Sequence, residues 1–463
     1  MSTRIRFPPD GLATDGLSTS TMAKPARKST QRARLLNGMA EATNRRGYTG
    51  ATVSAVIAEA GVSRPTFYDY FVDRDDCFRA AIEAVQMELL DLVRHTVEAG
   101  EGEDAFANGV RALVSFAVTD PSSARFLMAE SLAGGPDALA ARDEGISAIA
   151  AAIGMAAARA AAGAPAVDLE GRVLVGSVYR MLATRLRRGE AAISKLSEDL
   201  IGWVRSYQRP ADHARWQTLQ AGMVPGRSPH VPEVPLQQMP SVFPPGRPRV
   251  PVEQIAENHR MRILYAVARL AEEKGYAATT VADITRLASV DGRVFYKHFA
   301  DKQDAFAAVH ELGFQQVMDV TAKAFFAGAS WPERSWEGGR ALTQLLQANP
   351  LVAHVGFVEA YAVGPAAVQR IEDSHIAFMF FLQEGLVQAD QEPPPSRVAM
   401  EAIIAAIFEV IYLQARRGDE LEVAGMLGQI AHLWLAPFLG VAEADAFIDS
   451  QMRPAKAPRS RKR

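Results

Sequence analysis

The chain has 463 residues, of which 48% are hydrophobic, and its formal net charge at pH 7 is −3. This length exceeds what one hydrophobic core supports, so two to four domains are expected. The single cysteine, Cys77, excludes a disulfide framework and a cysteine-based zinc site within one chain, and it fits a reducing cytosol. The net charge argues against indiscriminate coating of nucleic acid, but it is compatible with local basic patches.

The N-terminal residues 1–31 are polar and end in a basic arm that includes Lys24, Arg27 and Lys28. They lack the apolar run of a signal peptide, and no stretch of about 18 apolar residues indicates a membrane span. We therefore predict a disordered arm on a cytoplasmic protein that has no membrane partner. Contact between this arm and DNA is one interpretation, and a solvated charge run is the other.

Residues 32–95, which we call the first reader, have the pattern of three short helices and a longer one. Apolar residues recur at helical spacing over 33–46, and Gly47 ends that helix. Thr52 is predicted to cap a short helix that runs through Ala60.

Gly61 supplies a turn after this helix, and Ser63 is predicted to cap the next one. Asp73 then caps a longer helix over about 75–95. Two short helices joined by a tight turn are typical of a helix-turn-helix, in which the second helix enters the major groove of DNA.

The reader helix after Ser63 presents side chains suited to DNA. Arg64 can pair with guanine and the Thr66 methyl can meet a thymine methyl, whereas Ser63, Tyr68 and Arg74 suit phosphates. The predicted DNA-facing residues are Thr52, Ser63, Arg64, Pro65, Thr66, Tyr68, Tyr70 and Arg74. The residues predicted to face inward are Val56, Val62, Phe67 and Phe71. The alternative is a three-helix bundle that binds no DNA.

Residues 96–207 read as four or five helices, with an alanine-rich segment at 148–166 that favours close helix packing. Residues 208–252 contain ten prolines, which predicts an extended linker. A second reader (253–313) and a second helical region (314–450) follow, and a basic tail occupies 451–463.

The two readers are copies of one pattern, placed 228 residues apart. The first copy contains Gly47-Tyr48, Thr52-Val53, Ala60, Val62, Phe67-Tyr68, Phe71 and Asp73; the second contains Gly275-Tyr276, Thr280-Val281, Ala288, Val290, Phe295-Tyr296, Phe299 and Asp301. Further on, Pro121 and Glu130 recur as Pro350 and Glu359, at an offset of 229. The helical regions are therefore duplicated together with the readers.

The second reader departs from the first at its turn and at the start of its reader helix. Ser289 replaces the turn glycine, where a positive φ is costly for a side chain. Asp291 replaces the capping serine and brings a negative charge towards phosphates. The residues predicted to contact DNA are Thr280, Asp291, Arg293, Val294, Tyr296, Lys297, His298 and Lys302. This DNA contact is therefore a weaker expectation than that of the first reader.

The arrangement Gly-Tyr…Thr-Val…Ala-Gly-Val-Ser-x-x-Thr-Phe-Tyr-x-x-Phe-x-Asp-Arg in residues 32–85 resembles the N-terminal domain of the TetR/AcrR family of bacterial repressors. The second copy, 259–313, resembles it with the departures named above. The resemblance implies an all-α fold of two tandem units, each a three-helix DNA-binding domain followed by a helical ligand-binding and dimerising domain. It also implies that ligand binding releases the protein from its operator.

The expected partners are a double-stranded DNA operator and a small apolar or amphipathic ligand. Pairing is expected either between two chains or, as a pseudo-dimer on an asymmetric operator, within one chain; by the resemblance it would use segments near 172–207 and 397–439. The alternative is a ligand sensor with a vestigial second reader that acts through protein contacts or as a homodimer. No cofactor, metal site or active site is indicated, so we do not expect an enzyme.

Several polar or aromatic residues in the apolar helices are pocket candidates, although each singly is more often part of a core or interface. They are Tyr179, Arg180, His354, Tyr361, His375 and Trp434. Met379, Phe380 and Phe381 are likewise predicted to be core residues.

Overall fold

The computed structural model describes residues 24–100, 104–160, 166–167, 170–190, 192–209, 236, 238–243, 250–387, 389, 394–417 and 423–452. The basic tail beyond 452, residues 1–23 and most of the predicted linker lie outside the described residues. The described residues fall into two compact units.

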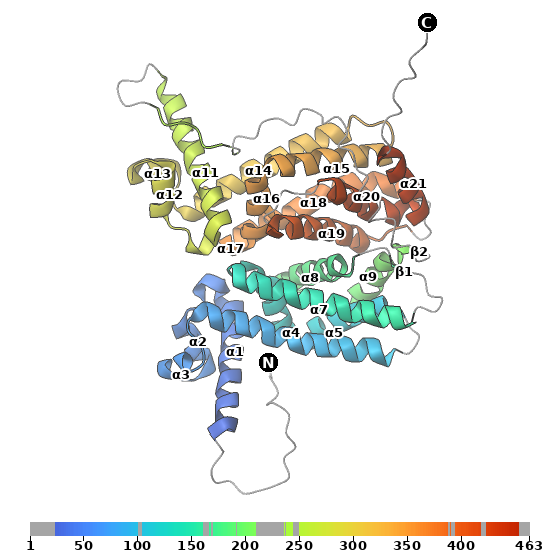
Figure 1. The fold of residues 1–463 in the computed structure, drawn as a ribbon, viewed down its shortest axis with the longest axis horizontal. Helices are drawn as coiled ribbons and strands as arrows, with labels where there is room; N and C mark the ends of the chain where they lie inside the picture. The colour runs from blue at the N-terminus through green and yellow to red at the C-terminus, as the bar shows by residue number, and fades with distance from the viewer. Residues whose placement is uncertain are drawn as a thin grey trace. The chain divides into compact units, whose positions relative to one another are not determined.

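The first unit contains the first reader and the helices that follow it (Figure 1). Its elements are α1 (Lys24–Gly50), α2 (Val53–Ala60), α3 (Arg64–Tyr68), α4 (Arg74–Ala99), α5 (Ala105–Thr119), α6 (Pro121–Arg125), the π-helix η1 (Phe126–Glu130), the 3-10 helix η2 (Ser131–Ala133), α7 (Pro136–Ala160), α8 (Gly171–Arg188), the 3-10 helix η3 (Ile193–Lys195) and the beginning of α9 (Leu196–Arg205). The segment Tyr361–Val368 also belongs to this unit.

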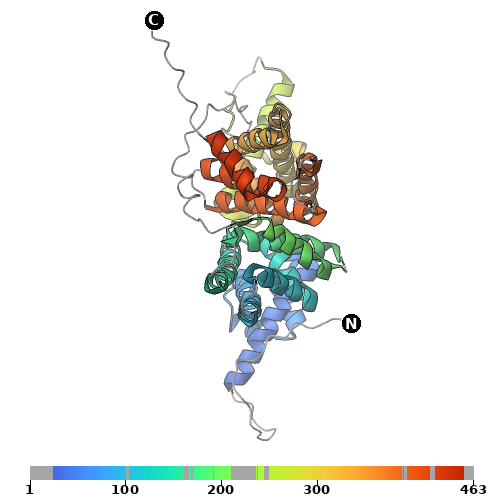
Figure 2. The same cartoon turned by 90° about the vertical axis from the view of Figure 1, so that its right-hand side faces the viewer.

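The second unit contains the second reader and the end of α9. Its elements are α11 (Val252–Ala278), α12 (Val281–Ala288), α13 (Gly292–His298), α14 (Lys302–Phe325), α15 (Trp331–Ala348), α16 (Pro350–His354), the π-helix η4 (Val355–Glu359), α17 (Ala360–Val363), α18 (Pro365–Val387), α19 (Arg397–Arg417), α20 (Val423–Leu439) and α21 (Val441–Met452), apart from the segment assigned to the first unit. The last two helices, at the red end of the colour scale, pack against each other (Figure 2).

The predicted all-α class is confirmed. Among the described residues, strands are limited to β1 (Ala166–Val167) and β2 (Gln208–Arg209), which pair antiparallel with Ala166 opposite Arg209. The duplication is also visible in the helices, because α6–η1 and α16–η4 each begin at a proline and pass from α- to π-helix at the same place.

Helix α1 begins earlier than the sequence pattern predicted. It starts at Lys24, inside the arm expected to be disordered, and it contains a break at Gly47 (φ 70). Alanine, arginine, lysine and glutamine are strong helix formers, and Pro25 is tolerated because it lies in the first turn. Apolar periodicity does not predict this extension, whereas helix propensity favours it.

Aromatic ring contacts hold each reader together. In the first unit the Phe78 ring of α4 lies 4.8 Å from Tyr48, next to the α1 break, and 5.3 Å from Phe126 of η1. In the second unit Tyr276 and Phe306 repeat the first of these contacts at 5.1 Å. In the first unit the reader and the helical domain thus share a core, and in the second unit the ring contact lies within the reader.

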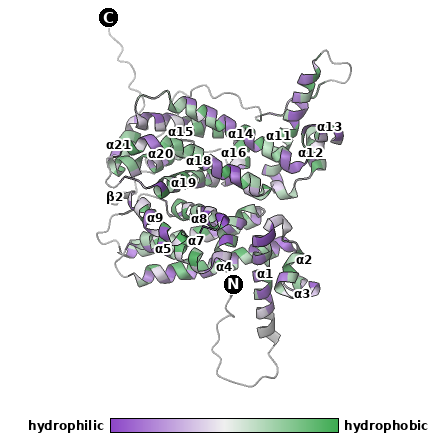
Figure 3. Cartoon of the chain, turned by 180° about the vertical axis from the view of Figure 1, so that it is seen from behind, coloured by the Kyte–Doolittle hydropathy of each residue, from purple (hydrophilic) through white to green (hydrophobic). Residues whose placement is uncertain are grey.

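The sequence predicts close helix packing of the alanine-rich segment, and α7 packs in this way on one face only. Ile149, Ala152 and Ile153 of the alanine-rich part of α7 are buried, whereas Met155 is 52% exposed. In the part of the chain that the structure describes, α19 is long and apolar enough to cross a membrane by length and composition, but 83% of that window is buried (Figure 3). Such a helix is typical of a protein core.

Candidate nucleic-acid interface

In the first reader, helices α2 and α3 each begin with a side-chain cap. The Thr52 side chain accepts a hydrogen bond from the Ala55 N–H at 3.3 Å, and the Ser63 hydroxyl accepts one from the Thr66 N–H at 3.3 Å. Gly61 between the helices has the left-handed φ of 60°. The caps and the turn are therefore as predicted, and they fix where the reader helix α3 starts.

One side of α3 is held in the core. Phe67 is completely buried, and its ring lies 5.7 Å from that of Phe71. Val56 is also buried, whereas Val62 is only half-buried. Because the helix has just five residues, burying Phe67 determines which side chains face outward.

The outward face carries most of the predicted DNA contacts. Ser63, Arg64, Pro65 and Tyr68 are exposed, as is Thr52, whereas Thr66, Tyr70 and Arg74 are half-buried. The Arg64 guanidinium lies 6.0 Å from the Tyr68 ring, a cation–π distance that leaves its N–H donors accessible. Such an arginine on the exposed face of a reader helix can donate two hydrogen bonds to guanine.

Arg74 has partners inside its own domain. It lies 4.3 Å from the Tyr48 ring, donates to the Tyr48 carbonyl at 3.3 Å and pairs with Asp75. Burial raises the pKa of Tyr48 to about 12. The cation therefore supports the end of α1, where carbonyls lack helical partners, and phosphate contact by Arg74 stays a prediction.

In the second reader, helix α12 begins with a capping box. Thr280 and Asp283 form a capping box, and Lys274 donates to the Asp283 carboxylate at 2.7 Å. The hydrogen bond from Lys274, followed by that from Thr280, holds the pKa of Asp283 well below its usual range. These contacts fix the start of α12.

Ser289 adopts the backbone of the glycine that it replaces. Its φ is 47° and its ψ is 51°, against 60° and 44° at Gly61, and it is the described non-glycine residue with positive φ. The predicted cost of a side chain at this turn therefore applies, because a Cβ crowds the backbone there. The turn keeps its shape in spite of the substitution.

The second reader helix, α13, carries a different set of exposed groups. Asp291 caps it by accepting from the Arg293 N–H at 2.7 Å. Arg293, Tyr296 and Lys297 are exposed, and Val294 and His298 are half-buried. Burial, with the nearby His259 and Arg260, lowers the pKa of His298. This face therefore combines a carboxylate with two permanent cations, whereas the first reader presents an arginine without a carboxylate cap.

Lys302 repeats the position of Arg74. Its ammonium donates to the carbonyls of Tyr276 at 2.9 Å and Thr279 at 2.8 Å, and it lies 4.2 Å from the Tyr276 ring. Burial lowers the pKa of Lys302. The same cation-to-helix-end contact thus supports both readers, and DNA contact by Lys302 stays a prediction as well.

The sequence pattern did not reveal the residues that tie α1 to the reader helix. Arg34 donates to the Gly61 carbonyl at 2.8 Å, Arg32 lies 5.8 Å from the Phe71 ring, and the Tyr70 hydroxyl donates to Gln31 at 3.3 Å. Of these residues, Gln31 lies in the predicted disordered arm, and Arg32 and Arg34 lie at the start of the predicted first reader, with no contact to the turn or to α3 predicted. Residues 30–34 are all helical, and Gln31, Arg32 and Arg34 contact the turn and the residues at and after the end of α3.

A second feature missed by the sequence pattern is the junction between each reader and its helical domain. In the first unit Asn44 donates to the Ser122 carbonyl at 2.9 Å. In the second unit the buried carboxylate of Glu359 accepts from the Tyr276 N–H at 2.7 Å. The recurrence of this glutamate in both repeats is the only feature of the sequence that points to the junction.

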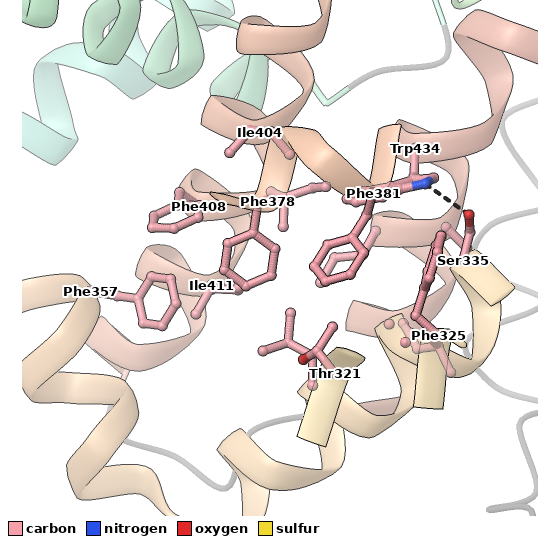
Figure 4. A pocket seen from close by; sticks show the side chains of 17 residues that line it. Thr321, Phe325, Ser335, Phe357, Phe378, Phe381, Ile404, Phe408, Ile411 and Trp434 are labelled. Atoms are coloured by element: carbon pink, nitrogen blue, oxygen red, sulfur yellow. Dashed lines mark hydrogen bonds between the residues drawn. The ribbon is translucent and has the colours of Figure 1, made fainter. Parts of the chain in front are cut away.

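The helical domain of the second unit contains a pocket lined by α14, α15, η4, α18, α19 and α20 (Figure 4). The pocket candidate Trp434 lines it, and so does Phe381, which is buried as predicted for a core residue. Phe380 is 60% exposed and is not part of the core. Within the described ranges, no group of three or more His, Cys, Asp or Glu side chains is placed to hold a metal ion.

The sequence model of the family described as "Bacterial regulatory proteins, tetR family" matches residues 35–81 and 263–309, which lie in the two readers. No curated protein sequence matches the chain.

Similar solved structures include the fatty acid degradation regulator FadR from Bacillus halodurans, at 18% identity and a TM-score of 0.35, covering 38% of this chain and 94% of that one. FadR from Bacillus subtilis in complex with stearoyl-CoA is 16% identical, with a TM-score of 0.32 and coverage of 42% and 97%. A TetR family transcription regulator from Marinobacter aquaeolei VT8 is 20% identical, with a TM-score of 0.33 and coverage of 40% and 98%.

The two matches lie where the same pair of capped helices occurs in each reader. The duplicated element is therefore a DNA-binding helix-turn-helix. The chain contains the helix-turn-helix DNA-binding domain of the TetR family of bacterial regulatory proteins twice.

Proposed function

We propose that the chain is a ligand-responsive repressor whose two readers bind one asymmetric operator as an intramolecular pseudo-dimer. The observation that carries this proposal is the difference between the two reader helices. One begins Ser63-Arg64-Pro65-Thr66 and the other Asp291-Gly292-Arg293-Val294. Readers that present different side chains to the major groove prefer different half-sites.

Pairing within one chain is supported by the composition of the second unit. The end of α9, from Gly202 onward, belongs to this unit although it lies before the linker in sequence. There the Tyr207 hydroxyl, completely buried, donates to the Leu433 carbonyl of α20 at 2.9 Å. A linker of residues 208–252, extended at about 3 Å per residue, is long enough to permit such pairing.

Ligand response is supported by the apolar pocket in the second helical domain, since ligand sites are concave and mostly apolar. Repression of transcription and a cytoplasmic location are proposed because both are typical of TetR-family regulators. The helical domain would act as the sensor and the readers as its output.

The test is sedimentation of the full chain with labelled DNA, followed by selection of binding sites from random DNA. We expect one chain per DNA and a site whose two halves differ in sequence. Two chains per DNA on a perfect palindrome would refute the pseudo-dimer.

Matched arginine variants assign each half-site. We expect Arg64→Ala and Arg293→Ala each to weaken binding by about 1–3 kcal/mol and to relax sequence preference in one half only. Arg94→Ala, which removes an exposed arginine near the end of α4 and far along the chain from the helix-turn-helix of α2 and α3, is the control and should leave the preference unchanged.

The second candidate function is a ligand sensor with a vestigial second reader. The carboxylate of Asp291, at the phosphate-facing end of α13, favours it because a negative charge opposes DNA. In that case Arg293→Ala would leave DNA binding unchanged, and two chains would bind through their first readers.

A further inference from the structure

The lining of the pocket in the second unit is uncharged throughout. Its 17 lining residues include no Asp, Glu, Lys, Arg or His. Three of them carry polar side-chain groups, namely Thr321, Ser335 and Trp434, and the rest are Gly, Ala, Leu, Ile and Phe. A charged ligand would lose its hydration here without gaining a partner, which is unfavourable.

Thr321 is the polar group in this lining that lacks a partner. The indole N–H of Trp434 already donates to the Ser335 hydroxyl at 2.9 Å. Thr321 is 5% exposed, and its Oγ1 has no hydrogen bond in the part of the chain that the structure describes. It lies on α14 opposite Phe378 and Phe381 (Figure 4). Since buried hydroxyls are normally paired, this one is available to a ligand.

The matching interior of the first unit is more tightly filled. Gly109 of α5 and Gly338 of α15 occupy the same repeat position. A Cβ built on Gly109 would lie 2.5 Å from Ile153 Cδ1, whereas one built on Gly338 would meet its nearest neighbour, Phe325 Cβ, at 3.5 Å. The side chain of Ile153 therefore lies directly against Gly109, whereas Gly338 makes only ordinary van der Waals contacts, with Phe325 and Thr321.

A buried cation adds to the difference between the two interiors. Tyr179, the counterpart of the pocket residue Phe408, is completely buried, and so is Arg142, whose guanidinium lies 5.9 Å from the Tyr179 ring. The first interior thus holds a large charged side chain beside the aromatic ring that would line a pocket.

We infer that the second unit binds one uncharged, largely apolar ligand per chain, and that the ligand's single hydrogen-bonding group pairs with Thr321. The inference rests on the proposed function, of which it names the ligand class and the sensing unit. The first unit reads DNA without such a ligand.

A pair of dyes that share their rings tests the charge requirement on the full chain. N-Phenyl-1-naphthylamine is uncharged, and 1-anilinonaphthalene-8-sulfonate adds a sulfonate. We expect the uncharged dye to saturate at one molecule per chain and the anionic dye to bind at least about tenfold more weakly, or about 1.4 kcal/mol. Two uncharged dye molecules per chain, or equal binding of the sulfonate, would overturn the inference.

Filling the pocket tests the location. Gly338→Leu and, independently, Leu342→Trp are expected to abolish binding of the uncharged dye. The control is Gly154→Leu, at an exposed helical glycine with nothing within 4 Å of its Cβ position, and it should bind normally. Binding that survives in both filling variants would place the dye elsewhere and contradict the inference.

Competition against the dye tests the anchor. We expect Thr321→Val to reduce the preference for 1-naphthol over naphthalene by about three- to tenfold, the range of one hydrogen bond. Thr343→Val is the matched control, because this buried hydroxyl already donates to the Arg340 carbonyl at 3.0 Å. An unchanged ratio in Thr321→Val refutes the anchor. All these titrations omit DNA, so their failure is distinguishable from a failure of operator binding.

Discussion

Glu359 joins the second reader to the wall of the pocket, and its replacement tests the strength of that junction. The carboxylate, which is 7% exposed, accepts from the Tyr276 N–H at 2.7 Å, where Gly275 (φ 81) breaks α11. Its other oxygen lies 3.5 Å from Nε2 of His354. Glu359 ends η4, and Phe357 of the same turn lines the pocket.

Glu359→Ala leaves the Tyr276 N–H buried without an acceptor. A hydrogen bond to a charged group contributes about 1.5–3 kcal/mol, so we expect the free energy of local opening to fall by about 2 kcal/mol. Amide exchange at Tyr276 should then be about 30-fold faster, since 1.4 kcal/mol is a factor of ten. Glu359→Gln retains an oxygen acceptor and should cost less than about 1 kcal/mol.

The assay is hydrogen–deuterium exchange of residues 270–280 in the full chain under folding conditions. Glu130→Ala, the equivalent change in the first unit, is the control, because Glu130 pairs with Arg125 at 3.3 Å and has no part in the Tyr276 bond. An acceleration below about threefold in Glu359→Ala would refute the reasoning, since a difference that small is under 1 kcal/mol.

Three stability changes follow from other positions. Ser289→Gly should raise the free energy of unfolding by about 0.5–1 kcal/mol, and the melting temperature with it, because glycine accepts the φ of 47° freely; a lower melting temperature contradicts this. Gly109→Ala should cost about 1–3 kcal/mol through its clash with Ile153, whereas Gly338→Ala should be neutral or stabilising, and equal melting temperatures would refute the difference. Burial, with Asp120 nearby, raises the pKa of Glu88 to about 7 from 4.5. The neutral carboxyl is thus favoured in the fold, and its contribution is complete below pH 4.5 and lost as pH rises through 7. Glu88→Gln should therefore stabilise by about 1 kcal/mol at pH 8.5, after discounting for solvent screening, and not at pH 4, as pH-dependent melting would show.

The parts of the readers that sequence could predict are those set by neighbouring residues. Thr52, Ser63 and Asp73 were assigned as caps because a cap depends on side-chain chemistry and on a helix that starts next to it. The turn at Ser289 was assigned for the same reason, from its alignment with Gly61.

Contacts between distant residues could not be predicted in this way. Glu359 and Tyr276 are 83 residues apart, and no periodicity relates them. Arg74 and Lys302 were assigned to phosphates because a cation beside a reader helix suits that role, but each also binds the end of the preceding long helix. The pocket depends on how α15, α18 and α19 pack, which residue type alone does not determine.

Fusion of two subunits removes a constraint that a homodimer imposes. In a homodimer every substitution occurs in both copies, so each copy has to read DNA and sense ligand. In one chain the copies change independently, and here they differ in both domains. The reader helix with Arg64 has no capping carboxylate such as Asp291. Ile153 crowds Gly109, whereas the neighbours of Gly338 are at ordinary contact distance. If ligand enters the second unit alone, its coupling energy, about 1–3 kcal/mol in such systems, acts first on the second reader through η4 and Glu359. The first reader would then keep its half-site, so ligand would weaken operator binding in degree rather than abolish it.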